Sequence, residues 1–191
     1  MERLIGTKKA FSRFEWYPRK IYIIRKVHLF RTDLQMVVNY IRSLIMNRKR
    51  NIAMILYSLS HGCHKRQLIF LSKVFAGINR VVCACQIPPS AELSKSTFLL
   101  HNGLGVVVHE HATIGERVVI CQNVTIGGGR GGNHPGGAPT IKSGCTIGAG
   151  AVLLGPIIIG ENAKIGANAV VLNDIPASST AVGSPAHIVV N

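Results

Sequence analysis

A repeat of six residues dominates the second half of the chain and constrains its fold more than any other feature. An α-helix has a period of about 3.6 residues and a β-strand a period of about 2, so neither explains a hexad. A hexad sustained this long is typical of a parallel β-helix, in which each aliphatic side chain points inward and stacks on its equivalent one coil away. The 13 aliphatic residues in phase are Ile87, Leu93, Leu99, Val108, Ile114, Ile120, Ile126, Ile141, Ile147, Leu153, Ile159, Ile165 and Val171.

The hexad is interrupted twice. Leu99 and Val108 are nine residues apart, so three residues are extra near His101. Ile126 and Ile141 are fifteen apart, so nine are extra in the glycine-rich segment 127–140. We expect segment 127–140 to leave the coil as an excursion loop. Loops held by a rigid scaffold are a common location for functional residues, so both breaks are candidate sites.

The first 85 residues have a helical pattern, which predicts a mostly helical N-terminal domain over 1–85 and a β-helix domain over 86–191. Thr32-Asp33 is typical of a helix N-cap, and apolar residues follow it at helical spacing. Two further helices are expected at about 52–60 and 65–82. The apolar residues expected on one face of the last helix are Leu68, Leu71, Phe75, Ile78 and Val82.

The net charge of +14 is confined to residues 1–85, where 17 Lys and Arg face 3 Asp and Glu, whereas residues 86–191 carry 5 of each kind. Such asymmetry indicates an anionic partner, with contact to a membrane surface through residues 1–50 as one interpretation and a solvated basic surface as the other. No recognised nucleic-acid motif is present, so no nucleic acid is expected as a partner.

Composition limits the remaining classes. A hydrophobic content of 47% excludes a disordered chain. The five cysteines contain no CxxC pair, so disulfide scaffolds and zinc modules are poorly supported. There is no signal-peptide pattern, and the longest apolar runs fall short of the roughly 20 residues that span a bilayer. We expect a cytoplasmic protein, or one peripheral to the inner membrane face.

Four motifs resemble the hexapeptide-repeat acyltransferases, in particular their serine O-acetyltransferase-like branch. They are FLLHNGLGVVVHEHATIGERVVICQNVTIGGG, the loop NHP, IGAGAVLLGPIIIGENAKIGANAVVLNDIP and AVGSPAHIV, within about 86–189. The resemblance implies a mainly β fold, a left-handed parallel β-helix, although right-handed crossovers are the general rule. It also implies acetyl-CoA as co-substrate, a small-molecule acceptor hydroxyl, and a homotrimer with acetyl-CoA between neighbouring subunits. The short N-terminal domain favours a trimer over a hexamer.

The resemblance assigns catalytic roles to three residues. His101 occupies the position of the family's general base, which takes the proton of the acceptor hydroxyl as it attacks the thioester. His134 occupies the position of a second histidine across the acceptor pocket. Gln86 stands where serine enzymes carry an aspartate that orients the base. A Gln oxygen can accept from the imidazole N–H but cannot stabilise imidazolium as a carboxylate does.

The acceptor pocket departs from the pattern of the serine enzymes. Leu100 stands where they have an aspartate, and Asn133 where they have an arginine that meets the substrate carboxylate. With Asn102 and Arg130, Asn133 is a candidate substrate-binding residue. Free serine needs both of its charges matched. The acceptor is therefore predicted to be either serine or a sugar hydroxyl of a polysaccharide.

The resemblance places acetyl-CoA against small residues of the later coils and the closing turn, which are Ala149, Ala167, Leu172, Asn173, Gly183 and His187. No metal is expected, although His109 and His111 form a pair on one outer face. Two alternatives to an acetyltransferase are a non-enzymatic β-helix scaffold or membrane adaptor, and a zinc hydratase. Cys83 and Cys85 are expected to be buried thiols.

Overall fold

The computed structural model describes residues 51–129 and 137–189, all within one compact unit, Lys49–Asn191. The helix predicted after Thr32 and the membrane contact predicted for residues 1–50 lie outside the described residues. So do Arg130, Asn133 and His134. Whether residues 1–85 form a domain of their own stays a prediction.

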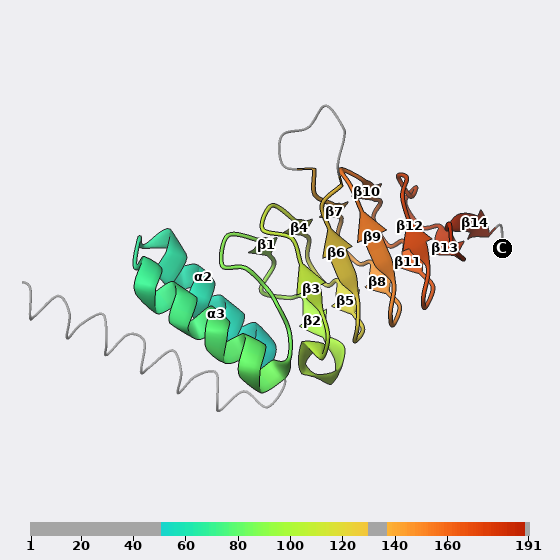
Figure 1. Cartoon of the computed structure of the whole chain (residues 1–191). Coiled ribbons are helices and arrows are strands. Elements are labelled where there is room, and N and C mark those ends of the chain that lie inside the picture. Colours follow the sequence, from blue (N-terminus) through green and yellow to red (C-terminus); the bar gives the residue numbers. More distant parts are fainter. Residues whose placement is uncertain (1–50, 130–136, 190–191) are drawn as a thin grey trace, which may run out of the picture. The chain divides into compact units, whose positions relative to one another are not determined.

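Two helices precede the coils (Figure 1). Helix α2 spans Ile52–Lys65 and helix α3 spans Ile69–Cys83. Asn51 caps α2, because its side chain accepts a hydrogen bond of 3.0 Å from the Met54 N–H. Both helices predicted at about 52–60 and 65–82 are present, but the boundary between them lies later in the chain than predicted. Gln67 has φ = 60°, in the left-handed region, so a turn separates α2 from α3.

The coils form three parallel sheets, and the chain visits sheets 1, 2 and 3 in turn (Figure 1). Sheet 1 contains β1 (Glu92–Leu93), β4 (Thr113–Ile114), β7 (Thr140–Ile141) and β10 (Ile158–Ile159). Sheet 2 contains β2 (Phe98–Leu99), β5 (Val119–Ile120), β8 (Thr146–Ile147), β11 (Lys164–Ile165), β13 (Thr180–Val182) and β14 (His187–Val189), of which β14 alone is antiparallel to its neighbour β13. Sheet 3 contains β3 (Val107–Val108), β6 (Thr125–Gly127), β9 (Val152–Leu154) and β12 (Val170–Val171).

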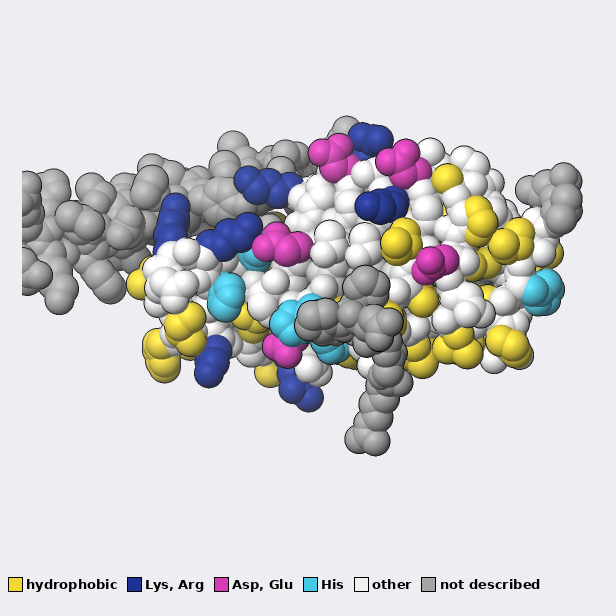
Figure 2. All heavy atoms as spheres, turned by 90° about the horizontal axis from the view of Figure 1, so that it is seen from above, with side chains coloured by type: hydrophobic (Ala, Val, Ile, Leu, Met, Phe, Trp, Pro, Cys, Tyr) yellow, Lys and Arg dark blue, Asp and Glu magenta, His cyan; other side chains and the backbone are white. Residues whose placement is uncertain are grey.

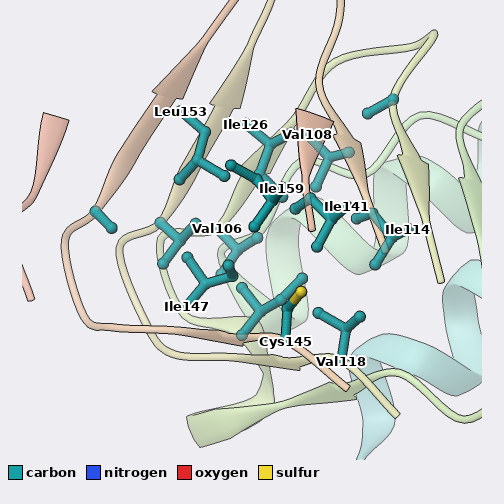
Figure 3. Packing of buried hydrophobic residues seen from close by; sticks show 14 of the residues in the cluster. Val106, Val108, Ile114, Val118, Ile126, Ile141, Cys145, Ile147, Leu153 and Ile159 are labelled. Atoms are coloured by element: carbon teal, nitrogen blue, oxygen red, sulfur yellow. The ribbon is translucent and has the colours of Figure 1, made fainter. Parts of the chain in front are cut away.

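The core is a stack of aliphatic side chains enclosed by the three sheets (Figure 3). All 13 aliphatic residues of the hexad are buried, which confirms the inward direction predicted from the period. Within each sheet the same hexad position pairs with itself one coil away, as Ile126 pairs with Leu153. Because every rung repeats the one before it, the backbone of the regular coils is fixed by stacking of the side chains together with backbone hydrogen bonds between coils.

Helix α2 covers the first coil and shares its core. Ala53, Met54 and Tyr57 belong to the same buried cluster as the aliphatic stack. The Tyr57 hydroxyl donates to the Ala91 carbonyl at 2.6 Å and accepts from the Leu93 N–H at 3.0 Å. Burial raises the pKa of Tyr57 to about 12. The helix is thereby fixed to the first strand of sheet 1.

Helix α3 buries a face that carries polar side chains. Its buried residues are Ser72, Asn79 and Cys83. Of the apolar residues predicted to share one face, Leu68, Leu71, Ile78 and Val82 are exposed and Phe75 is half-buried. The reason is the chemistry of the α2–α3 contact. The Ser60 hydroxyl donates to the Ser72 carbonyl at 2.8 Å, and Asn79 Nδ2 donates to the Ala53 carbonyl at 3.1 Å. Small, hydrogen-bonded residues let the helices approach closely and leave the apolar side chains outside.

No helix among the described residues is long and apolar enough to cross a membrane.

Candidate active site

The first break in the hexad is a bulge at the end of β2. Leu100–Gly103 form a 3₁₀ turn between sheets 2 and 3, as expected for three extra residues. His101 and Asn102 have φ values of 52° and 56°, both in the left-handed region. That conformation costs roughly 1–2 kcal/mol per non-glycine residue, so the surrounding structure must hold it. The His101 side chain is exposed.

The base of the bulge is packed against the helices. Gly103 is buried at φ = +72°, and a Cβ there would lie 3.1 Å from Leu99 Cδ1 and 3.6 Å from Ala53 Cβ. The Leu104 N–H donates to the His101 carbonyl at 3.2 Å, and the Gly105 N–H donates to the Ala84 carbonyl at 2.9 Å. The bulge therefore closes on itself and on the segment that follows α3.

The bulge that carries His101 lies at the edge along which the register of sheet 2 aligns small residues of the later coils. Leu99, Ile120, Ile147, Ile165 and Ala181 pair in succession. Two residues beyond each of the last four, the chain turns toward sheet 3, at Gln122, Ala149, Ala167 and Gly183, whereas after Leu99 the bulge Leu100–Gly103 stands at this edge. The Asn123 N–H donates to the Leu104 carbonyl at 2.8 Å, so Leu104, directly after the bulge, is the neighbour of Gln122 one coil away. The Gly150 N–H donates to the Gln122 carbonyl at 3.0 Å, and the Asn168 N–H donates to the Ala149 carbonyl at 2.8 Å. We call this row, on the edge between sheets 2 and 3, the His101 column.

His187 lies beside the last member of the column. A Cβ on Gly183 would lie 3.0 Å from His187 Cε1, so the imidazole of β14 packs against this glycine. Four of the six residues predicted to bind acetyl-CoA, Ala149, Ala167, Gly183 and His187, therefore share an edge with the predicted base.

The other two predicted acetyl-CoA residues lie on the opposite edge of sheet 3. Leu172, half exposed, and Asn173 follow β12, where the chain turns toward sheet 1. The excursion loop leaves at the same edge, after β6, and its base is closed by the Gly129 N–H donating to the Gly137 carbonyl at 3.0 Å. Within one chain the structure does not bring this second edge to His101.

Gln86 is held through its backbone. Its N–H donates to the Val106 carbonyl at 2.8 Å, and its carbonyl accepts from the Val108 N–H at 2.9 Å. Its side chain is exposed, and within 51–129 and 137–189 it makes no hydrogen bond to His101. The orienting role of Gln86 stays a prediction.

His109 and His111 lie side by side, as predicted, with ring centroids 5.5 Å apart. His109 packs at the start of the excursion loop, because a Cβ on Gly128 would lie 2.8 Å from His109 Nε2. In the part of the chain that the structure describes, no three His, Cys, Asp or Glu side chains gather in a group that could hold a metal ion.

Four cysteines are buried, including Cys83 and Cys85 as predicted. Burial raises the pKa of the Cys85 thiol to about 12 and raises the pKa values of the Cys63, Cys83 and Cys145 thiols as well. These cysteines are therefore thiols at neutral pH and poor nucleophiles.

Sequence reasoning missed Asn51. Its Nδ2 donates to the Leu99 carbonyl, at the strand end from which the bulge leaves, while its Oδ1 caps α2. The available signal was an asparagine directly before the apolar run that begins at Ile52, which is the pattern of a helix N-cap.

Comparison with known proteins identifies the family. The bacterial transferase hexapeptide family (six repeats) matches residues 138–173. The serine acetyltransferase of Helicobacter pylori is 41% identical over 140 residues, which cover 72% of this chain and 79% of that protein. The chain belongs to the serine acetyltransferase family of hexapeptide-repeat acyltransferases.

Solved serine acetyltransferases share the fold. The soybean serine acetyltransferase complexed with serine is 40% identical, with a TM-score of 0.67 over 72% of this chain and 56% of that chain. A serine acetyltransferase in complex with CoA is 36% identical, with a TM-score of 0.66 over 72% of this chain and 55% of that chain. This chain thus spans little more than half the length of these two solved serine acetyltransferases.

Proposed function

We propose that the protein is an acetyl-CoA-dependent serine O-acetyltransferase built on a left-handed β-helix, with His101 as general base. The observation that carries the proposal is the His101 column. An exposed histidine on a strained bulge lies at the head of an edge that continues past Gln122 to the small residues Ala149, Ala167 and Gly183, in a chain 41% identical to a serine acetyltransferase.

In the proposed reaction the His101 imidazole takes the proton of the acceptor hydroxyl. The hydroxyl oxygen attacks the thioester carbonyl of acetyl-CoA, and the tetrahedral intermediate collapses with loss of the CoA thiolate. The imidazolium returns its proton to that thiolate, so the products are the O-acetyl ester and free CoA. A base placed within hydrogen-bond reach typically contributes about 10²–10⁴-fold to the rate.

The column suits the extended arm of CoA. Coils of a β-helix are about 4.8 Å apart, so Ala149, Ala167 and Gly183 form a shallow strip leading away from the base. All three are at least partly exposed. Side chains this small leave backbone N–H and C=O groups within reach of the amides of a pantetheine arm. One solved relative is named as a complex with CoA.

A homotrimer would complete the site. His101 lies on one edge of sheet 3, whereas Leu172, Asn173 and the base of the excursion loop, Gly129 and Gly137, lie on the other. The outward residues of sheet 3 are Val107, Thr125, Val152 and Val170, none of them charged. Packing of this uncharged face against a neighbour would bring the second edge of one subunit to the first edge of the next. Val152→Lys should then give monomers in light scattering, with loss of activity.

Serine is the acceptor that the family favours, and a sugar hydroxyl is the acceptor that Gln86, Leu100 and Asn133 favour. The deciding experiment measures thiol release from acetyl-CoA with serine and with a panel of sugars, for the wild type and His101→Ala. Stimulation by serine that is lost in His101→Ala supports the proposal. If only sugars stimulate thiol release, the acceptor is a sugar hydroxyl and not serine. If the protein does not bind acetyl-CoA, the proposal is wrong and the alternative of a non-enzymatic scaffold is favoured.

We also propose that the protein binds the cytoplasmic face of an anionic membrane, using the outer face of α3. Phe70 and Val81 are 83% and 85% exposed, and Lys73 and Arg80 are exposed on the same helix. Figure 2 shows hydrophobic and basic side chains side by side at the helical end of the described residues. No acidic residue occurs between Asp33 and Glu92, so a second copy docking here would bring like charges together. An apolar face with basic flanks suits an anionic lipid surface.

Vesicle co-sedimentation tests this membrane contact. The full chain should bind vesicles of phosphatidylglycerol and phosphatidylcholine, and Phe70→Ser with Val81→Ser should weaken that binding at unchanged charge. If the double variant binds vesicles as well as the wild type does, the membrane contact is made by other basic residues and not by the outer face of α3. No binding by the wild type, or a changed oligomeric state in the variant, would show that another surface covers α3.

A further inference from the structure

Helix α2 contacts the bulge on both sides of His101. Two residues before His101, the Leu99 carbonyl accepts from Asn51 Nδ2. One residue after it, Asn102 Oδ1 accepts from the Ile52 N–H at 3.3 Å. Both contacts come from the start of one helix, so the first turn of α2 spans the segment that presents the base.

The first turn of α2 is itself fixed from behind. Asn79 is 1% exposed, and its Nδ2 donates to the Ala53 carbonyl at 3.1 Å while its Oδ1 accepts from Cys85 Sγ at 3.4 Å. Ala53 and Cys85 also line the space beside Gly103, each with its Cβ 3.6 Å from the position of a glycine Cβ. A continuous set of contacts therefore runs from α3 through α2 to the bulge.

We propose that Asn51 is a positioning residue for His101 in the acetyl transfer reaction. The inference rests on the proposed function, because it assumes that His101 is the base. A single amide does two tasks: its oxygen starts α2, and its nitrogen holds the strand end from which the bulge leaves. The tether fixes a histidine whose backbone conformation is strained, and proton transfer needs the imidazole within hydrogen-bond reach of the hydroxyl.

The side chain of Asn102 takes part in the same arrangement. Its Oδ1 accepts from the Ile52 N–H, which fixes the orientation of the amide. The Nδ2 and the second lone pair of Oδ1 are left to meet a substrate.

Asn51→Ser is the main test. Serine caps a helix about as well as asparagine does, but it is too short to reach the Leu99 carbonyl and keep the cap. We expect kcat to fall about 10- to 100-fold, with less than about a 3-fold change in the KM for acetyl-CoA, because the small residues of the column are untouched. Asn51→Asp is a second variant that keeps the size and the cap but cannot donate.

Tyr57→Phe is the matched control. It removes the two hydrogen bonds that fix the middle of α2 to the first strand of sheet 1 and leaves the bulge contacts in place. The control should lower the melting temperature and keep kcat. If Asn51→Ser and Tyr57→Phe lower the melting temperature alike and neither changes kcat, Asn51 is a structural residue and the inference is wrong.

A second readout is independent of activity. In NMR spectra of protein labelled on the histidine ring carbons, the His101 signal, assigned with His101→Ala, should be single in the wild type and shifted or broadened in Asn51→Ser. An unchanged signal overturns the inference. If the wild type transfers no acetyl group, the proposed function fails, and with it the catalytic meaning of Asn51, whereas the NMR comparison still decides whether Asn51 positions the ring.

Discussion

The first coil and the later coils solve the same folding problem in different ways. From residue 138 onward, each hexad stacks on an equivalent hexad, and backbone hydrogen bonds between coils fix the chain. Around His101 there is no equivalent rung, so side chains of α2 and α3 take over that task. The comparison shows that the exposed histidine lies where the hexad repeat is interrupted. There, contacts from the helices replace the stacking and hydrogen bonds that fix the regular coils.

The largest expected effect on activity is that of removing the proposed base in the first coil. His101→Ala should lower kcat by about 10²–10⁴-fold, because general base catalysis is lost. The melting temperature should change little, since the side chain is exposed. Steady-state kinetics of thiol release and a thermal melt measure both quantities. His64→Ala, in α2, is the control and should keep full activity; an equal loss in both variants would argue against His101 as the base.

A matched pair of core truncations separates the two regions. Leu99 and Leu153 are both 0% exposed, one at the bulge and one in a regular coil. Each change to alanine should lower the free energy of unfolding by about 2–5 kcal/mol in urea denaturation. Only Leu99→Ala should also lower kcat under folding conditions. An equal effect of the two variants on kcat would mean that the bulge is no more sensitive than the coils.

The buried amide between the helices gives a smaller effect. Asn79→Ala leaves the Ala53 carbonyl and the Cys85 thiol without that partner, so the free energy of unfolding should fall by about 1–3 kcal/mol. Activity should fall as well, because the change loosens the support of α2. Urea denaturation and kcat measured together check this; a loss of stability alone would confine Asn79 to folding.

The smallest expected effect is the loss of thermal stability at alkaline pH. Burial raises the pKa of Tyr57 from 10.0 to about 12, so the folded state keeps its proton more tightly than the unfolded state. The contribution of Tyr57 is therefore complete below pH 10 and is lost as the pH rises toward 12. Melting temperatures from pH 8 to 11 should fall more steeply for the wild type than for Tyr57→Phe. Parallel curves would mean that Tyr57 does not titrate in this way.

Most of the coil could be predicted from the sequence because its period is unusual. Only a β-helix places residues as far apart as Ile87 and Val171 in one inward phase, and the interruption after Leu99 identified the bulge. The roles of His101 and Ala149 came from the resemblance, whereas their alignment on one edge required the strand register, which a single sequence does not reveal.

The helices were harder to predict, because an amphipathic pattern shows two faces without saying which one is buried. In α3 the buried face contains Ser72 and Asn79, whose polar groups find hydrogen-bond partners. The apolar face with Phe70 and Val81 is outside. Asn51 was missed because its second partner, Leu99, lies 48 residues away in the sequence.

Along the His101 column, successive coils place equivalent residues at equal spacing. Each coil moves a contact by one fixed step along the edge, so the distance from the bulge to a residue of a later coil grows by the same amount with every coil between them. An insertion of one complete coil between Ala149 and Ala167 would keep the hexad and the stacking of its aliphatic residues. It would nevertheless change how long a thioester carrier must be to reach His101. In such a scaffold, a change in the number of coils can alter the length of substrate that the site accepts, while every side chain of the site stays the same.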